Sequence, residues 1–258
     1  MTRFLRELSE SGELFAVLLR VQMQQRYSGS VLGLLWALLM PMLTILSFSI
    51  IFAGLSGWNL ADYGVYFFCG YVPWTFFQAS SLNAAESLVG NPLYVTRLPM
   101  PSQILPLVQV AASGIDALIH LAILFAIMPA LGAPFHPAMI CLPASILITA
   151  AAGAGASLLA AQATVFFRDF RYLLSSALFL WFFFSPVLWQ PASLQGPMRE
   201  FYRLNPAVPF LELFQLPVRQ GVVPPAETWI LASAVAAALC LAGSVSFSAN
   251  RRRFYYYL

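Results

Sequence analysis

The chain has no lysine: all thirteen basic residues are arginine, and ten acidic residues leave a formal net charge of +3 over 258 residues. This absence excludes Schiff-base and lysine general-base chemistry, as well as a P-loop lysine for a nucleotide phosphate. Charge of either sign is scarce, because 9% of the residues are charged and 60% are hydrophobic. A soluble domain carries about a quarter charged residues, so the composition excludes a soluble globular enzyme.

Cysteine and histidine are equally sparse. Cys69, Cys141 and Cys240 lie far apart inside apolar runs, which fits neither metal-ligand spacing nor a disulfide framework. Neither His120 nor His136 sits in a pattern of metal ligands or in a Ser-His-Asp arrangement. We therefore expect no catalytic residue, no bound metal and no cofactor in this chain.

Long apolar runs are what the sequence has in abundance. About twenty apolar residues cross the ~30 Å hydrocarbon core of a bilayer as a helix. The predicted fold is an all-α integral membrane protein, with residues 1–258 forming a single transmembrane domain. Six spans are predicted, at residues 31–55, 63–82, 104–131, 137–167, 172–189 and 228–247.

The placement of the arginines predicts the orientation. With the N-terminus inside, ten arginines fall in cytoplasmic segments, and only Arg199, Arg203 and Arg219 fall outside. Basic residues near span ends are retained in the cytoplasm. We expect a multi-pass protein of the cell inner membrane with both termini cytoplasmic.

The first thirty residues are predicted to form an amphipathic helix in the inner membrane interface. Leu14 and Leu18 share an apolar face, while Arg20 and Arg26 are expected to face lipid phosphates. The alternative is an ordinary cytoplasmic helix packed on its neighbours.

Two connecting segments are too structured for simple loops. Residues 83–103 begin polar and then carry three prolines, with a fourth at Pro106, which indicates a built cytoplasmic elbow rather than a passive loop. Residues 190–227 include the apolar piece PFLELFQLPV. They are predicted to form two short interfacial or re-entrant helices on the outer side.

One ionisable pair lies inside the third span. Asp116 and His120 are four residues apart and share a helix face. Such groups are costly in a membrane and often functional, so a proton relay is one interpretation. The other is that the pair is satisfied by itself, by a neighbouring helix or by a water-filled cavity. A proton-coupled carrier would be expected to show internal repeats, and none is evident.

Aromatic residues near span ends usually form interfacial belts, but aromatic faces also suit a corridor for sugar rings. The candidate translocation path comprises Trp36, Phe52, Tyr71, Trp74, Trp181 and Phe184. The small-residue run 153–163 indicates close helix packing, either inside the subunit or across a dimer seam. A conduit for a polymer needs energy, and without a Walker A segment ATP hydrolysis has to come from a partner.

Four segments resemble one family, the membrane subunits of type 2 ABC exporters that move lipid-linked surface polysaccharides such as O-antigen, capsule and teichoic acid. They are RYSGSVLGLLWALLMPML, NPLYVTRLPMPSQILP, FFRDFRYLL, and SPVLW followed by RLNPAVPFLELFQLPVRQG. Their order is kept along nearly the whole chain. A small-lipid or drug exporter is the alternative on the same scaffold.

The resemblance implies a homodimer with two copies of a cytoplasmic ABC ATPase, in which ATP and magnesium bind the partner subunit. Its other implied partners are the lipid-linked polysaccharide and membrane lipids, and no nucleic acid. Coupling to the ATPase is implied for Asn83, Glu86, Asn91, Leu93, Tyr94 and Arg97. Candidates for substrate access are Arg20, Arg26, Tyr27, Arg168 and Arg171, of which the last two fit positive-inside anchors equally well. The implied periplasmic gate is formed by Tyr202, Asn205, Phe210 and Arg219. The short tail RRRFYYYL carries no carbohydrate-binding domain, so recognition of glycan chain ends is expected of the partner.

Overall fold

The computed structural model describes residues 11–27, 35–97, 100–190 and 196–258; for seven of these, only the backbone is described (Tyr27, Ala37, Ser56, Pro197, Met198, Phe201 and Arg203). All regular structure in the described residues is helical, which agrees with the predicted all-α class. The elements are α2 (Gly12–Tyr27), α3 (Leu35–Ser56), α4 (Leu60–Ser87), α5 (Pro92–Arg97), α6 (Ile104–Ile127), η1 (Pro137–Cys141), α7 (Leu142–Phe166), α8 (Phe170–Phe184), α9 (Pro197–Leu204), α10 (Val208–Gln215), η3 (Leu216–Gln220), α11 (Ala226–Asn250) and α12 (Phe254–Tyr257).

Four stretches of the described residues are long and apolar enough to cross a membrane. They are Leu38–Leu55 within α3, Ile104–Ile127, Pro137–Phe166 and Ala226–Asn250. The apolar helix α8 has 15 residues and is shorter than these. The chain therefore has the helices of a multi-pass membrane protein.

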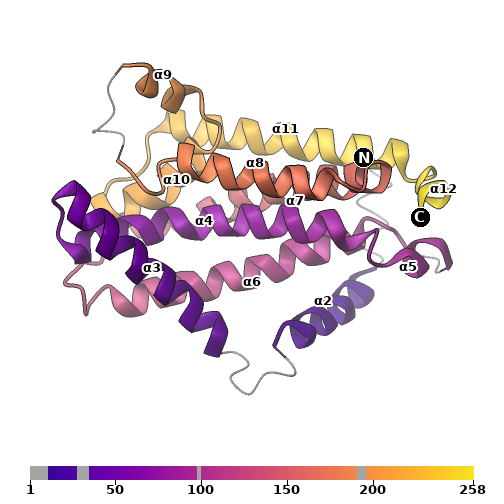
Figure 1. Ribbon diagram of the computed structural model, residues 1–258, viewed down its shortest axis with the longest axis horizontal. Helices are drawn as coiled ribbons and strands as arrows, with labels where there is room; N and C mark the ends of the chain where they lie inside the picture. The colour runs from indigo at the N-terminus through magenta and orange to yellow at the C-terminus, as the bar shows by residue number, and fades with distance from the viewer. Residues whose placement is uncertain (1–10, 28–34, 98–99, 191–195) are drawn as a thin grey trace.

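Helix α4 is the centre of the bundle (Figure 1). It packs against α3, α6, α7, α8 and α10, and much of its surface is buried, including Phe67 and Phe68 at 0% exposure. A helix that neighbours surround can carry polar residues that a lipid-facing helix cannot. This explains why α4, although 28 residues long, is less apolar than the four candidate spans.

Helices α7 and α11 make the closest crossing, and two glycines permit it. A Cβ on Gly155 would lie 2.3 Å from the backbone carbon of Leu239, and one on Gly243 would lie 2.5 Å from the Gly155 carbonyl oxygen. Nearby, the Cys240 thiol donates to the Ala151 carbonyl at 2.9 Å. The run 153–163 thus packs inside the subunit against α11 at this crossing, which supports the first of the two alternatives.

Several predicted boundaries differ from the observed ones. The second span is predicted at 63–82, but α4 continues through Asn83 and Glu86. The helix continues because small and apolar residues in this turn still face the bundle. The elbow therefore begins near Leu88, where Gly90-Asn91-Pro92 ends the helix. The third helix ends at Ile127, and the fifth occupies only Phe170–Phe184 before the chain turns at Ser185-Pro186.

The two ends of the bundle differ in charge. At one end, called the basic end here, lie α5, the α7–α8 turn and α12 (Figure 1). It carries Arg97, Arg168, Arg171, Arg251, Arg252 and Arg253. At the opposite end, called the far end, lie α9 and α10 (Figure 1). A small apolar cluster at the basic end joins Val95 of α5, Leu158 of α7 and Phe254 of α12.

The α7–α11 crossing supplies a test of the fold. We expect Gly155→Ala to lower the stability of the purified protein by about 2–3 kcal/mol, because the new methyl group meets backbone that cannot move aside. The measurement is thermal unfolding in detergent. Gly54→Ala is the control, since a Cβ there meets nothing within 4 Å. Equal melting temperatures for the two variants would contradict the close crossing.

Candidate functional site: the two ends of the bundle

Helix α5 presents the residues predicted to contact an ATPase. Leu93 and Tyr94 are 62% and 41% exposed and Arg97 is also exposed, whereas Val95 is 3% exposed and anchors the helix. The turn before α5 is held by hydrogen bonds from the Gly90 N–H to the Glu86 carbonyl at 2.8 Å and from the Asn91 side chain to the Ser87 carbonyl at 3.0 Å. The described part of the elbow up to Arg97 therefore has a hydrogen-bonded turn, a buried anchor at Val95 and an outward-facing surface.

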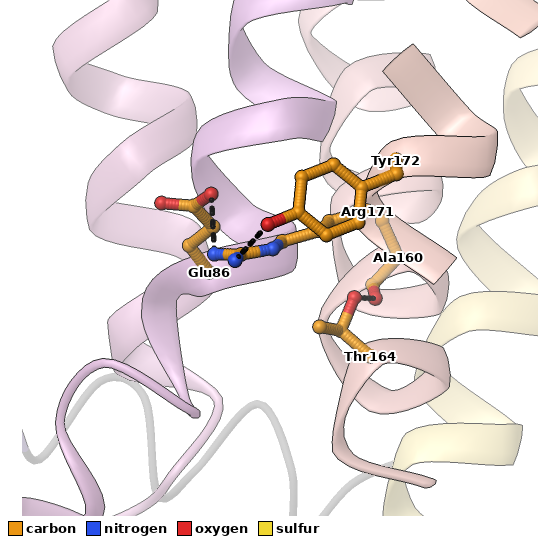
Figure 2. Close-up of polar contacts among 5 residues, drawn as sticks. All are labelled: Glu86, Ala160, Thr164, Arg171 and Tyr172. Carbon is orange, nitrogen blue, oxygen red and sulfur yellow. Dashed lines mark hydrogen bonds and ion pairs between the residues drawn. The ribbon is translucent and has the colours of Figure 1, made fainter. Parts of the chain in front are cut away.

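Glu86 connects this elbow to the α7–α8 turn (Figure 2). Its Oε1 lies 3.1 Å from Nη1 of Arg171, whose Nη2 donates to the Tyr172 hydroxyl at 2.5 Å. The pair lines a pocket of about 400 Å³ together with Arg168 and Gly90. Both charged side chains are more than one-third exposed, so solvent screens the pair and it is easily exchanged.

The structure thus brings predicted access residues and a predicted coupling residue into one pocket. Arg168 comes from the α7–α8 turn, Arg171 from the first turn of α8 and Glu86 from the last turn of α4. Asn83 is exposed one turn earlier on α4. Sequence reasoning assigned these residues to two separate roles and did not foresee their contact.

Arg26 has a different partner in the structure from the lipid phosphates that were predicted. Its guanidinium forms an ion pair with the Asp116 carboxylate of α6, instead of facing lipid phosphates, and α2 packs along α6. Helix α2 thus contacts the bundle along α6, while its Val17 and Val21 are 58% and 42% exposed, so its predicted location in the membrane interface stays a prediction. Arg20 is exposed, and the side chain of Tyr27 lies outside the described part of the chain.

This ion pair also answers the question of Asp116 and His120. Asp116 is satisfied by a neighbouring helix, one of the possibilities left open. The His120 ring lies 6.2 Å from the Tyr71 ring, and its Nδ1 has no hydrogen-bond partner within the described residues. The carboxylate is therefore paired with Arg26 of α2, which favours the second interpretation over a proton relay.

The candidate path aromatics do not form one corridor in the subunit. Trp74 is 3% exposed and meets Trp181 edge-to-face, with ring centroids 5.7 Å apart; both line an apolar cavity of about 300 Å³ with Phe210. Trp36 and Tyr71 instead line a separate cavity of about 270 Å³ beside Asp116. The remaining two are apart from both cavities: Phe52 stacks on Tyr63, and Phe184 is 46% exposed on α8.

At the far end, Asn205 is the centre of the predicted gate. It is 4% exposed. Its Oδ1 accepts from the Trp181 indole at 2.9 Å and from the Ala207 N–H at 3.0 Å. Its Nδ2 donates to the Phe184 carbonyl at 3.2 Å. One amide therefore fixes the end of α8 to the loop between α9 and α10.

Tyr202 and Arg219 hold other parts of this end. The Tyr202 hydroxyl donates to Glu212 at 2.5 Å, and Thr228 of α11 donates to the other carboxylate oxygen at 3.0 Å. Burial, followed by the bond to Glu212, raises the pKa of Tyr202, so the phenol stays protonated and donates. The Arg219 guanidinium lies 4.4 Å from the Trp58 ring centroid.

Sequence reasoning missed the clamp on the segment after α8. The hydroxyls of Tyr63 and Tyr66 donate to the carbonyls of Leu188 and Pro186 at 2.7 and 2.8 Å, and Gln215 donates to Pro186 at 2.8 Å. Glu212 was missed as well, although a lone acid in PFLELFQLPV was a usable signal. Within the described residues, no group of three or more histidine, cysteine, aspartate or glutamate side chains is placed to hold a metal ion.

Comparison with known proteins identifies relatives along the chain. The profile of the family described as ABC-2 type transporter matches residues 13–216. The chain is 28% identical over 256 residues to the O-antigen export system permease protein RfbA of Myxococcus xanthus, covering 98% of both chains. It is 24% identical over 183 residues to a protein of the same name from Klebsiella pneumoniae, covering 69% of each chain.

The Arg26–Asp116 pair yields a prediction on stability. Arg26→Gln leaves a carboxylate without its cation inside an apolar bundle, so this variant should be less stable than the Arg26→Gln/Asp116→Asn double variant. A double-mutant cycle of thermal unfolding should give a coupling energy of about 1–3 kcal/mol. Additive effects would mean that the two side chains do not interact.

The Asn205 network yields a second prediction. Asn205→Ala leaves the Trp181 indole and the Phe184 carbonyl without their partner, and we expect a loss of about 2–3 kcal/mol. Chemical denaturation in detergent measures this change. Substituting alanine for the exposed Gln220 nearby should change stability by less than about 0.5 kcal/mol, and a similar loss in both variants would count against a special role for Asn205.

Proposed function

The chain belongs to the ABC-2 type transporter family, and on that premise we propose that it is the permease of an ATP-driven exporter for a lipid-linked, O-antigen-like polysaccharide. The observation that carries the proposal is the likeness to an O-antigen export permease along 98% of both chains. The names of the relatives favour O-antigen over capsular polysaccharide or teichoic acid. The chain is a transport subunit and not an enzyme, and an ABC ATPase subunit hydrolyses the ATP.

The proposed topology has six spans, formed by α3, α4, α6, α7, α8 and α11. Four of them are supported by length and hydropathy. Helix α4 is 28 residues long, or about 42 Å, and its protein surroundings explain its lower hydropathy. Helix α8 is extended by residues 185–189, which are largely buried. The arginines of the basic end support a cytoplasmic location for that end, in the inner membrane, with both termini cytoplasmic.

In the proposed complex, two permeases form a homodimer with the channel between them, and each binds one ATPase subunit that holds ATP and magnesium. Helix α5 is the piece that docks on the ATPase, supported by the exposure of Leu93, Tyr94 and Arg97. Phe179 and Phe183 leave an exposed apolar surface on α8, 59% and 45% exposed, which a second copy would cover.

The pocket at the basic end is the proposed place where the diphosphate of the substrate lipid is first held. Arg168 and Arg171 line it, and arginine suits bidentate binding of phosphate. Because the Arg171–Glu86 pair is exposed and weak, a diphosphate with its two negative charges would compete with Glu86 for Arg171, in a pocket that Asp169 also lines. Glu86 is hydrogen-bonded to the turn before α5 through its backbone carbonyl. Displacement of the Glu86 side chain by the substrate would therefore affect α5, the proposed coupling helix.

At the far end, α9 and α10 are the proposed periplasmic gate. The predicted gate residues link several helices at this end. Asn205 binds Trp181 of α8, and Tyr202 binds Glu212 of α10. Phe210 lines a cavity with Trp181, and Arg219 lies over the Tyr66 ring of α4. Opening the gate would need these polar contacts to break together, which keeps it closed in the absence of ATP-driven movement.

Reversal of charge on α5 tests the coupling role. We expect Arg97→Glu to abolish or strongly reduce export of the polysaccharide and to weaken co-purification of the ATPase, because the docking surface loses its cation. Export is measured as polysaccharide at the cell surface, and ATPase recovery is measured after mild detergent extraction.

The control is Arg199→Glu, which makes the same change on the exposed surface of α9 at the far end. It should leave ATPase recovery unchanged. Normal export by the Arg97→Glu variant would contradict the coupling role, and a permease dimer that survives extraction with no ATPase in the unmodified protein would contradict the exporter assignment.

A further inference from the structure

The segment that follows α11 has two chemically different sides. Arg251, Arg252 and Arg253 come directly after the last residue of α11. The next turn, α12, turns its tyrosines outward: Tyr255, Tyr256 and Tyr257 are 58%, 87% and 54% exposed. Phe254, in the same turn, is fully buried. Charge and two tyrosine rings, those of Tyr255 and Tyr256, therefore face outward, whereas Phe254 faces the protein and Tyr257 meets the Phe166 ring edge-to-face at 5.1 Å between centroids.

The buried ring reaches the elbow. Phe254 lies 5.1 Å from Phe247 of α11 and 5.9 Å from Phe166 of α7 between ring centroids. It shares an apolar cluster with Val95, the buried residue of α5, and Leu88 at the start of the elbow. Helices α12 and α5 are in direct contact, and both lie at the basic end (Figure 1). An interaction that holds α12 in place therefore also supports α5, through the apolar cluster that Phe254 shares with Val95 and Leu88.

The outward side has the chemistry of a membrane-surface anchor. Three consecutive arginines begin one residue after a candidate membrane span, and residues 251–258 contain no acidic side chain. Arg252 and Arg253 are exposed. Clusters of arginine beside a span are attracted to anionic phospholipid headgroups, and tyrosine is favoured at the depth of those headgroups.

We propose that residues 251–257 bind anionic phospholipid headgroups and that Phe254 transmits this attachment to α5. The surface of the membrane then acts as a partner that sets how firmly the elbow is held. The lipid-binding part rests on the segment itself, whereas its consequence for transport rests on the coupling role proposed above for α5. Because the attraction is electrostatic, it weakens as the salt concentration rises.

Hydrogen exchange of the full-length chain in lipid nanodiscs tests the proposal directly. The comparison is between nanodiscs of phosphatidylcholine alone and nanodiscs that also contain phosphatidylglycerol. We expect backbone amides of both 254–257 and 93–97 to exchange severalfold more slowly when phosphatidylglycerol is present, and high salt to remove this difference. Equal exchange rates in the two membranes would overturn the proposal.

Two sets of variants test separately the charge of the three arginines and the apolar contact made by Phe254. Replacing all three arginines with glutamine should abolish the lipid effect on both segments, whereas replacing them with lysine should preserve it. Phe254→Ala should keep the lipid effect on α12 but lose it on α5, and Phe254→Leu, which retains most of the apolar volume, should keep both. Loss of the effect in the lysine variant would indicate a specific arginine contact and overturn the headgroup assignment.

Binding of α12 to a protein partner is the competing explanation. The same exchange measurement, made with and without the ATPase subunit, distinguishes it from lipid binding. Protection of α12 that needs the ATPase subunit and is independent of the lipid would overturn the proposal. Exchange is read on the permease without ATP or polysaccharide, so a negative result here would leave the proposed transport function unaffected. Failure of the transport function would appear instead as absent export with the lipid effect intact.

Discussion

The need to satisfy polar groups inside hydrocarbon governs this structure, because a bilayer offers no water to pair with them. Asp116 is the clearest case. It lies within a candidate span, and the cation that neutralises it comes from α2, ninety residues earlier in the chain. The pairing draws α2 onto α6 and determines where the N-terminal helix sits. A single carboxylate in an apolar helix thus fixes the position of a whole element.

The same constraint shapes the far end in a different way. There, irregular backbone follows α8, and its carbonyls are paired by side chains from elsewhere. Tyr63 and Tyr66 of α4, Gln215 of α10 and Asn205 together serve the stretch from Phe184 to Trp189. Non-helical backbone is tolerated in this environment only when protein groups complete its hydrogen bonds. The far end is therefore held by a set of specific and breakable contacts.

The basic end is built from weaker interactions, and this difference has a functional meaning. The Arg171–Glu86 pair is exposed and costs little to exchange, while Val95 and Phe254 give α5 and α12 a shared apolar support. In the coupling role proposed for α5, an element that passes movement from an ATPase to the bundle would need a firm base and replaceable contacts at its surface. Val95 and Phe254 form the firm base. Glu86 forms the replaceable contact with Arg171.

The sequence by itself determined the class of protein, the order of the helices, the elbow after α4 and the presence of helices between α8 and α11. These features depend on local composition and on helix-breaking residues, both of which can be read along the chain. Only the tertiary structure decided that Arg26 pairs with Asp116, that Trp74 belongs to the buried core, that Gly155 of α7 meets α11, and that Phe254 supports α5. Each of these joins residues far apart in the chain, and such pairings are decided by packing geometry, which local sequence does not encode.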